Sequence, residues 1–308
     1  MIEMSTNQFL IRTLAETMAS KIIRDIKTGT NRSLRNSIDL GLYFSKSPVQ
    51  KEFFGLAKSI AHNSNNMYLP LIKGAFENVD ENIIKMVGLN LGISSFTIGA
   101  KQIQGLYAVG EKPEMWIQIL DEHMIEDNSL FENKLLNYKA SGVYAFIVDN
   151  LREDSQIKKA LALTLLSKES TFFFNIAMDN LSSDMLNELK ASKNIVIFVK
   201  QDKEKITTDL FNNLRKAHLL YGFCKHYNTF KNLESEETYL KDMINLGCLF
   251  GVYMDGPDTF NDYENSRYEE ICKSRITGNL PIILYDFYRD CSFIQETILH
   301  KRHLTLEE

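Results

Sequence analysis

Acidic and imidazole side chains follow the apolar segments in the second half of the chain, and these residue types support metal or acid–base chemistry. Imidazole and carboxylate groups from neighbouring segments can share one divalent cation, and they can also exchange protons with a substrate. The candidate ligand-binding residues are Asp121, His123, Asp149, Asp179, His226, Tyr253, Asp255, Asp286, Arg289 and Cys291. Asp121, His123, His226, Asp255 and Asp286 would supply a metal site or the acid–base groups. The alternative, which we favour, is that these are ordinary polar loop residues and that the Asp side chains cap the following helices.

Each candidate lies at or just beyond the end of an apolar run of strand length, with an amphipathic stretch before the next run. The runs are Trp116-Leu120, Val143-Val148, Thr171-Ala177, Ile195-Val199, Leu220-Cys224, Cys248-Met254 and Pro281-Phe287. Runs that are apolar on both faces are typical of parallel strands covered by helices. We therefore predict an α/β fold with a partial or full (β/α) TIM-like barrel of parallel strands. A doubly wound open sheet is the alternative, and in both architectures ligands bind beyond the carboxyl ends of the strands.

The first part of the chain has helical periodicity instead, and nothing in it resembles a strand. Apolar residues recur at three- and four-residue steps between Phe9 and Ile26. Further helices are expected at Ser33-Phe44, Val49-His62, Tyr68-Phe76 and Asp80-Leu89, with Ser47 and Asp80 as helix-capping residues. The expected division is a helical N-terminal domain at 1–110 and a barrel domain at 111–308. Because the linker near Pro113 is short, we expect the two to pack together.

Charge and composition exclude several functional classes. The net charge of −5 argues against a nucleic-acid-binding protein, which needs a basic face. There is no secretory signal and no apolar run of about 20 residues, so no membrane partner is expected. The four Cys residues, none in a CxxC pair, are typical of reduced cytoplasmic thiols. Phosphate-loop, dinucleotide-binding, nucleophile-elbow and HExxH motifs are all absent from the sequence.

A small basic cluster is the main electrostatic feature of the N-terminal part. Residues 1–60 contain nine Lys and Arg against five Asp and Glu. Arg24, Lys27, Arg32 and Arg35 surround the turn at 28–31. Such a cluster is compatible with a phosphate or an acidic partner. A solvated helix end is the simpler interpretation.

Several segments of the second half carry a family resemblance through their shared order and spacing. They include Gly142-Val143-Tyr144-Ala145-Phe146, Thr171-Phe172-Phe173-Phe174, Leu220-Tyr221-Gly222-Phe223, Gly247-Cys248-Leu249-Phe250-Gly251-Val252-Tyr253-Met254 and Leu280-Pro281-Ile282-Ile283-Leu284-Tyr285-Asp286-Phe287-Tyr288. Across about residues 115–291 the chain resembles the radical S-adenosylmethionine (SAM) superfamily, in the branch that has a partial barrel and often a C-terminal cysteine extension. The resemblance implies a barrel whose first strand is followed by a CxxxCxxC motif that holds a 4Fe–4S cluster.

Three elements of that family pattern are missing here. The loop at 121–127 has no cysteine, and carboxylates with one imidazole are poor replacements for three thiolates. Asp149-Asn150-Leu151 occupies the place of the family's Gly-Gly-Glu turn, so the close backbone approach that glycine permits is lost. The cysteine-rich extension is represented only by Cys291, which we expect in the loop after the last strand.

These departures imply that the cluster is absent, and without it no 5′-deoxyadenosyl radical forms. We therefore expect no catalytic residues, no 4Fe–4S cluster and no resident metal. The leading hypothesis is a non-catalytic binding or accessory protein, for a protein or peptide partner or for a small molecule at the barrel mouth. The expected partner is a true radical SAM enzyme, or the peptide or cofactor substrate of such an enzyme. The alternative is a barrel hydrolase or lyase that uses the acidic rim with a divalent metal, and residual SAM binding ranks below both.

Overall fold

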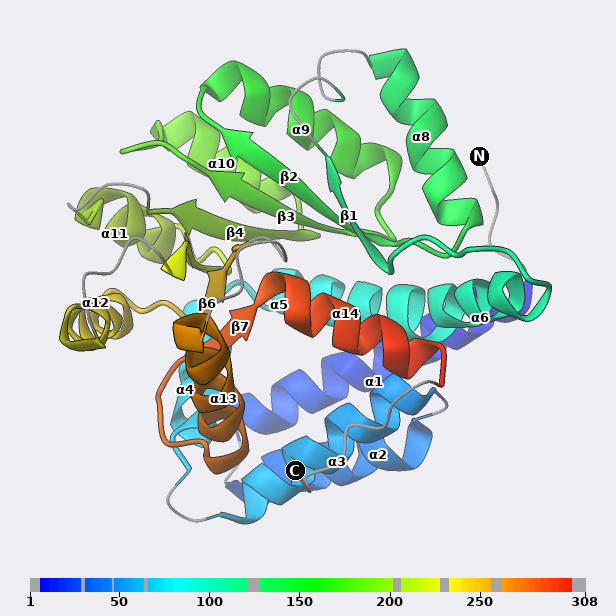
Figure 1. Cartoon of the computed structure of the whole chain (residues 1–308), viewed down its shortest axis with the longest axis horizontal. Coiled ribbons are helices and arrows are strands. Elements are labelled where there is room, and N and C mark those ends of the chain that lie inside the picture. The colour runs from blue at the N-terminus through cyan, green and yellow to red at the C-terminus, as the bar shows by residue number, and fades with distance from the viewer. Residues whose placement is uncertain are drawn as a thin grey trace.

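Seven parallel strands form one curled sheet in the computed structural model, which describes residues 6–28, 31–45, 47–63, 66–120, 124, 128–201, 206–227, 233–255 and 262–300. The strands are β1 (Ile117–Leu120), β2 (Ala145–Leu151), β3 (Thr171–Ile176), β4 (Ile195–Lys200), β5 (Tyr221–Lys225), β6 (Phe250–Tyr253) and β7 (Ile283–Asp286). They pair in chain order from β1 to β7, and the sheet order does not return from β7 to β1. The predicted α/β fold is confirmed as a partial barrel (Figure 1). The doubly wound alternative is wrong, because such a sheet reverses its strand order at a switch point.

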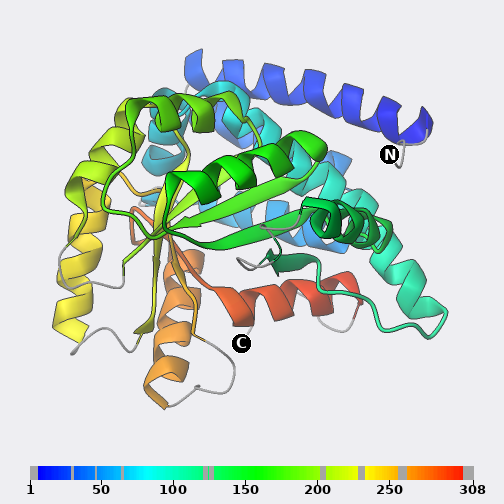
Figure 2. The same ribbon diagram turned by 90° about the horizontal axis from the view of Figure 1, so that it is seen from above.

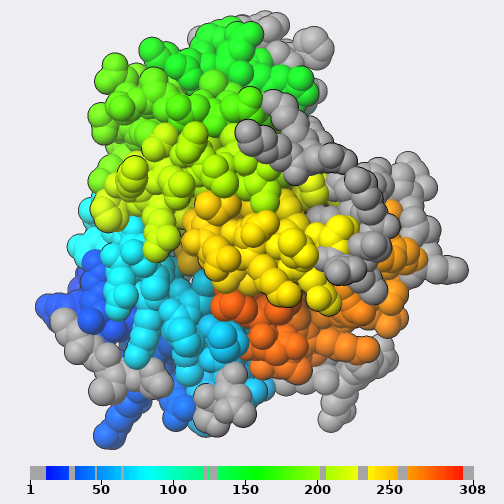
Figure 3. Space-filling view, turned by 90° about the vertical axis from the view of Figure 1, so that its left-hand side faces the viewer, coloured from blue at the N-terminus to red at the C-terminus, as the bar shows by residue number. Residues whose placement is uncertain are grey.

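A helix follows each strand, and the helices from α8 to α13 cover the outer face of the sheet. These helices are α8 (Asn128–Ala140), α9 (Asp154–Leu166), α10 (Ser183–Ala191), α11 (Thr208–Lys216), α12 (Leu233–Asn245), α13 (Asp262–Thr277) and α14 (Phe287–Ile298). Seen from above in Figure 2, the helices from α9 to α13 form an arc around the fan of strands. In Figure 3 they occupy one side of the molecule in chain order, from green to orange, with the blue and cyan N-terminal helices at the lower left.

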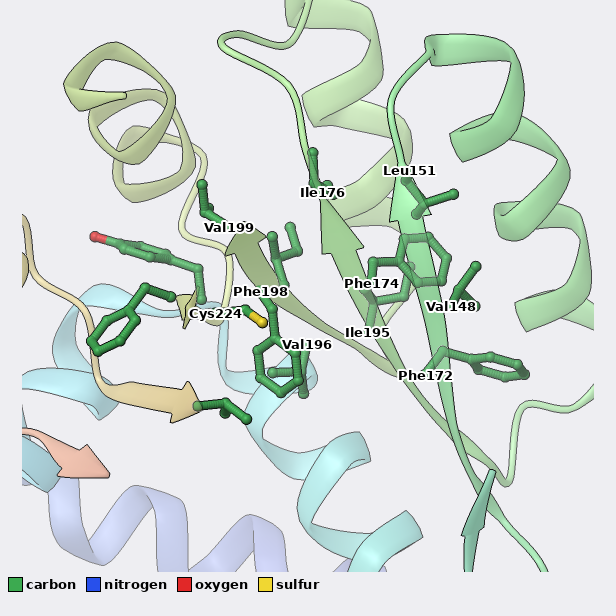
Figure 4. Packing of buried hydrophobic residues seen from close by; sticks show 14 of the residues in the cluster. Val148, Leu151, Phe172, Phe174, Ile176, Ile195, Val196, Phe198, Val199 and Cys224 are labelled. Atoms are coloured by element: carbon green, nitrogen blue, oxygen red, sulfur yellow. The ribbon is translucent and has the colours of Figure 1, made fainter. Parts of the chain in front are cut away.

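Both faces of the strands are buried, which explains why the strand segments are apolar without alternation. On the outer face, Phe146, Phe172 and Phe174 belong to a large apolar cluster with residues of the helices that follow the strands. Figure 4 shows Phe172 and Phe174 within this cluster. On the inner face, Ala145 and Ile147 belong to a second cluster, which also includes residues of α6 and α14. Two-sided burial of this kind is the general property of parallel sheets in α/β folds.

The N-terminal part forms a helical cap made of α1 (Thr6–Thr28), α2 (Asn31–Phe44), α3 (Pro48–His62), α4 (Tyr68–Asn78), α5 (Glu81–Leu89), the π-helix η1 (Asn90–Gly99) and α6 (Ala100–Ala108). The expected helix caps are present, since the side chains of Ser47 and Asp80 accept hydrogen bonds from backbone N–H groups of α3 and α5. The sequence patterns did not predict the continuation of α5 through η1 and α6. Gly and Ser residues, which have weak helix propensity, dilute the pattern there.

The cap lies against the amino-terminal ends of the strands. The Asp80 backbone N–H donates to the carbonyl of His218 before β5, over 2.9 Å. The Asn90 side-chain amide donates to the carbonyl of Ser170 before β3, over 2.8 Å. At the crossing of η1 with the segment before β2, a Cβ on Gly99 would lie 2.2 Å from the carbonyl oxygen of Gly142. In Figure 1 the run from α5 to α6 lies directly beneath the sheet. The carboxyl ends of the strands therefore lie at the opposite edge of the sheet from these contacts, although Cys291 packs against the cap in the cluster that includes Val49 and Ala100.

One helix among the described residues is long and apolar enough to span a membrane by length and composition alone. It is the continuous run Glu81–Ala108, and 56% of its most apolar window is buried inside the structure. The sequence contains no uninterrupted apolar run of that length. This helix packs under the sheet through Ala100 and Ile103.

Candidate functional site

Residues at the ends of β5, β6 and β7 form a connected polar cluster. Nδ1 of His226 lies 3.5 Å from Oδ1 of Asp255. The backbone N–H of Tyr227 donates to Oδ2 of Asp255 over 2.7 Å, and the Tyr227 hydroxyl donates to Oδ2 of Asp286 over 3.2 Å. Both carboxyl groups are buried, with Asp255 5% and Asp286 1% exposed. The structure thus brings together three of the predicted residues, and the link between them is Tyr227, which sequence analysis missed.

Asp286 is the N-cap of α14. Its Oδ1 accepts a hydrogen bond from the backbone N–H of Arg289, and its own backbone N–H donates to Oδ2 of Asp290 over 3.0 Å. Burial raises the pKa of Asp286 to about 6, although the hydrogen bond from the Arg289 backbone and the Arg289 guanidinium both oppose that rise. The capping interpretation therefore describes this residue well. It also explains why the helix begins immediately after the strand.

Tyr253 is buried against the helices that follow β5 and β6. Its hydroxyl donates to Oε1 of Glu236 in α12 over 2.7 Å, and its ring stacks on Tyr227 at a centroid distance of 4.3 Å. Nη2 of Arg267 in α13 donates to the same Glu236 oxygen over 2.6 Å. Burial raises the pKa of Tyr253. Glu236 and Arg267 were not candidates, because on a single sequence they look like ordinary residues of amphipathic helices.

Arg289 and Cys291 lie in α14, so the expectation that Cys291 lies in a loop is wrong. Asp286 caps the helix at once and leaves no room for a loop. Arg289 donates to the Glu264 carbonyl and to Asn265 of α13. Cys291 is 8% exposed, and its carbonyl accepts a hydrogen bond from the indole of Trp116 over 3.1 Å. Burial raises the pKa of the Cys291 thiol.

Asp149 forms a separate group at the ends of β2 and β3. Its Oδ1 accepts a hydrogen bond from the amide of Asn175 over 2.5 Å. The strand pairing shifts register between Val148 and Leu151, and Asn150 has a φ of 60°, in the left-handed region. Asn175 is 1% exposed, and its Oδ1 has no hydrogen-bond partner within the described part of the chain. The pair therefore leaves one buried acceptor unsatisfied at the carboxyl end of the sheet.

Of the three remaining candidates, Asp179 alone belongs to the described residues. Asp179 is exposed beyond β3. Asp121 and His123 lie outside the described residues. Within the described ranges, no group of three His, Cys, Asp or Glu side chains is arranged to hold a metal ion.

The four cysteines are dispersed over the second half of the fold. Cys224 lies in β5, Cys248 lies two residues before β6, Cys272 lies in α13 and Cys291 lies in α14. All but Cys272 are buried, and burial raises the pKa of the Cys248 thiol. None belongs to the segment after β1.

Comparison of the chain with models of protein families, with curated proteins and with solved structures gave no match. The functional argument therefore rests on the residues and geometry described above.

Proposed function

We propose that this chain is a radical-SAM-like partial barrel that has lost its iron–sulfur cluster and functions in the cytoplasm as a non-catalytic binding or accessory protein. Its ligand would be a protein or peptide partner, or a small molecule at the carboxyl ends of the strands. Descent from a radical SAM enzyme favours one class of partner. That class is a true radical SAM enzyme, or the peptide or cofactor substrate of such an enzyme. Nucleic acid and membrane are not proposed as partners.

The absence of cysteine from residues 121–127, directly after β1, is the observation that carries this proposal. A 4Fe–4S cluster is normally held by thiolates. Three of the four thiols in the chain are buried elsewhere in the fold. High thiol pKa values at Cys248 and Cys291 oppose the deprotonation that iron binding requires.

The cluster at the ends of β5, β6 and β7 supports a structural role for most of the candidate side chains. Asp255, Asp286 and Tyr253 are all buried and hydrogen-bonded to protein groups. Buried carboxylates held in this way stabilise loop and helix positions, and reaching a substrate would require breaking those bonds.

The Asp149–Asn175 pair supports a role in ligand binding for the carboxyl end of the sheet. A buried amide oxygen without a partner carries a free-energy cost of about 1–3 kcal/mol, which a ligand donor would remove. Asn175 Oδ1 is such an atom within the described residues, and it lies beside the half-buried carboxyl group of Asp149.

Anaerobic reconstitution of the full chain with iron and sulfide tests the loss of the cluster. We expect no stoichiometric 4Fe–4S absorbance and no SAM cleavage on reduction. A C224A/C248A/C272A/C291A variant is the matched control, because it measures adventitious iron on the same fold. Stoichiometric cluster incorporation into the natural sequence above this control, with reductive cleavage of SAM, would overturn the proposal.

A hydrolase or lyase with a divalent metal is the second candidate, and the contact between His226 and Asp255 favours it. This pair joins an imidazole and a carboxylate from the ends of adjacent strands at 3.5 Å. Elemental analysis of the purified protein separates the two proposals. One tightly held divalent ion per chain, lost in H226A, would establish the metal enzyme and displace the non-catalytic interpretation.

A further inference from the structure

A β-bulge at the carboxyl end of the sheet places Asp149 beside Asn175. Between the paired positions 148/174 and 151/176, the two residues Asp149 and Asn150 of β2 oppose the single residue Asn175 of β3. Ile147 and Phe173, two positions earlier on each strand, contact the inner apolar cluster. Because side chains alternate along a strand, Asp149 and Asn175 also lie on the inner face of the partial barrel.

These two side chains offer more hydrogen-bond acceptors than the protein satisfies. Nδ2 of Asn175 donates to Oδ1 of Asp149, so the amide oxygen of Asn175 lies on the other side of the amide group. That oxygen has no partner within the described ranges, although the residue is only 1% exposed. No Lys or Arg in the described part of the chain forms an ion pair with Asp149. A ligand that suits both residues is therefore a hydrogen-bond donor with a positive charge.

Tyr288, the second residue of α14, brings an aromatic ring to the same place. Burial raises the pKa of Tyr288, and the negative charge of Asp149 is the next cause of that rise. The phenol and the carboxylate therefore approach each other, although one belongs to β2 and the other to the helix after β7. Both side chains are half-buried, so a ligand can reach them.

A carboxylate beside a tyrosine ring binds an arginine elsewhere in this fold. The guanidinium of Arg275 donates to both carboxylate oxygens of Asp290, over 2.9 and 3.0 Å. Its central carbon lies 5.6 Å from the ring centroid of Tyr285 and 5.9 Å from that of Tyr268. A guanidinium suits such a place because it combines a flat face for the ring with a fork of N–H donors for the carboxylate.

We propose that Asp149, Asn175 and Tyr288 bind an arginine side chain of a peptide or protein partner. The inference rests on the binding role proposed above and specifies the chemistry of the partner. The guanidinium donates to Asp149 and to the amide oxygen of Asn175, and its flat face lies on the ring of Tyr288. Asn175 is enclosed in the free protein, so binding at both acceptors includes a small side-chain movement. Since residues 1–60 have an excess of basic residues and the whole chain a net charge of −5, the rest of the chain is acidic and attracts a cation.

Calorimetric titration of the full chain with the capped tripeptide acetyl-Gly-Arg-Gly-amide tests the proposal. The end groups of this probe carry no charge, so its guanidinium is its only cation. We expect one saturable site, with about tenfold weaker binding in D149N and about fivefold weaker binding in N175L, which keeps the side-chain volume without the amide. Y288L should also weaken binding, whereas Y288F keeps the ring and should not.

Two further peptides separate the guanidinium from other groups. A peptide with citrulline, which has the same shape without the charge, should not bind. A peptide with lysine should bind about fivefold more weakly, because an ammonium group has no planar fork of donors. Equal binding of either peptide would contradict a guanidinium site.

D179N is the matched control, because Asp179 is an exposed acidic residue just beyond β3 at the same edge of the sheet. Circular dichroism shows whether each variant is folded, and D149N, at a half-buried position, keeps the test decisive if N175L does not fold. Absence of saturable binding at millimolar peptide, or equal weakening in D149N and D179N, would overturn the proposal.

The arginine site and the proposed function fail separately. A chain that incorporates no cluster and does not bind the arginine peptide loses the arginine site alone. Stoichiometric cluster incorporation with SAM cleavage overturns the non-catalytic role, whatever the peptides do.

Discussion

Replacing Asp286 by Asn should make the stability of the protein less dependent on pH between about pH 4 and pH 6. In the folded state the carboxyl group is 1% exposed, and burial raises its pKa from 3.8 to about 6. The groups that face it are the Tyr227 hydroxyl, the Arg289 guanidinium and backbone N–H, and the carboxylate of Asp290. A raised pKa means that the folded state holds this proton more tightly than the unfolded state.

The sign and size of the effect follow from linkage. The contribution of Asp286 to stability is fully present below its unfolded pKa and is lost as the pH rises through the folded pKa. A difference of about two pKa units corresponds to about 3 kcal/mol at most. The free energy of unfolding of the natural protein should therefore fall, relative to D286N, by up to this amount between pH 4 and pH 6.5. Asparagine retains a side-chain oxygen for capping α14, so the helix itself is preserved.

Urea denaturation of both proteins at pH 4.0, 5.0, 6.5 and 7.5 measures this difference. Groups common to both proteins cancel in the comparison, so the pH dependence of the difference belongs to Asp286 and its neighbours. A difference that stays constant with pH would refute the argument from burial. A difference of opposite sign would show that the charge of Arg289 dominates and that the folded pKa of Asp286 is depressed.

Two further predictions concern the packing of the cap and the network at the ends of β5 and β6. G99A should destabilise the protein by about 1–3 kcal/mol, because its Cβ would collide with the carbonyl of Gly142. G105A is the control, since Gly105 lies in the same long helix with open space around it. Thermal denaturation should show G105A to be neutral or stabilising. Equal melting temperatures for the two variants would contradict the close crossing. E236A should cost about 1–3 kcal/mol, because the buried Tyr253 hydroxyl loses its acceptor and Arg267 is left with Glu270 alone, and E236Q, which keeps an oxygen acceptor, should cost less. If chemical denaturation gives both variants the stability of the natural chain, the network contributes nothing.

Local patterns in the sequence were sufficient to predict most of the helices and strands. The seven apolar runs correspond to β1–β7, since each is a short stretch bounded by polar residues. The capping roles of Ser47 and Asp80 were also predictable, because a helix cap depends on residues within one turn. The helices η1 and α6 were not predicted, because packing against the sheet compensates for their weak propensity.

The candidate site was predicted only in part. Polar residues at the carboxyl ends of strands were an expectation of the fold class, and His226, Asp255 and Asp286 do come together there. Their link through Tyr227 could not be predicted, because it depends on the distance between the ends of three strands. The position of Cys291 was misjudged for a related reason, since the buried cap at Asp286 starts the helix one residue after the strand.

The sequence alone was enough to identify the types of elements and their order, and to show that cysteine is missing after β1, because these properties depend on residues close together in the chain. The partners of each polar side chain were decided by the folded structure. Tyr253 lies with Glu236, Trp116 lies with Cys291, and Asn175 lies with Asp149. These pairs are separated by 17 to 175 residues, and only the curvature of the sheet and the packing of its helices bring them within reach.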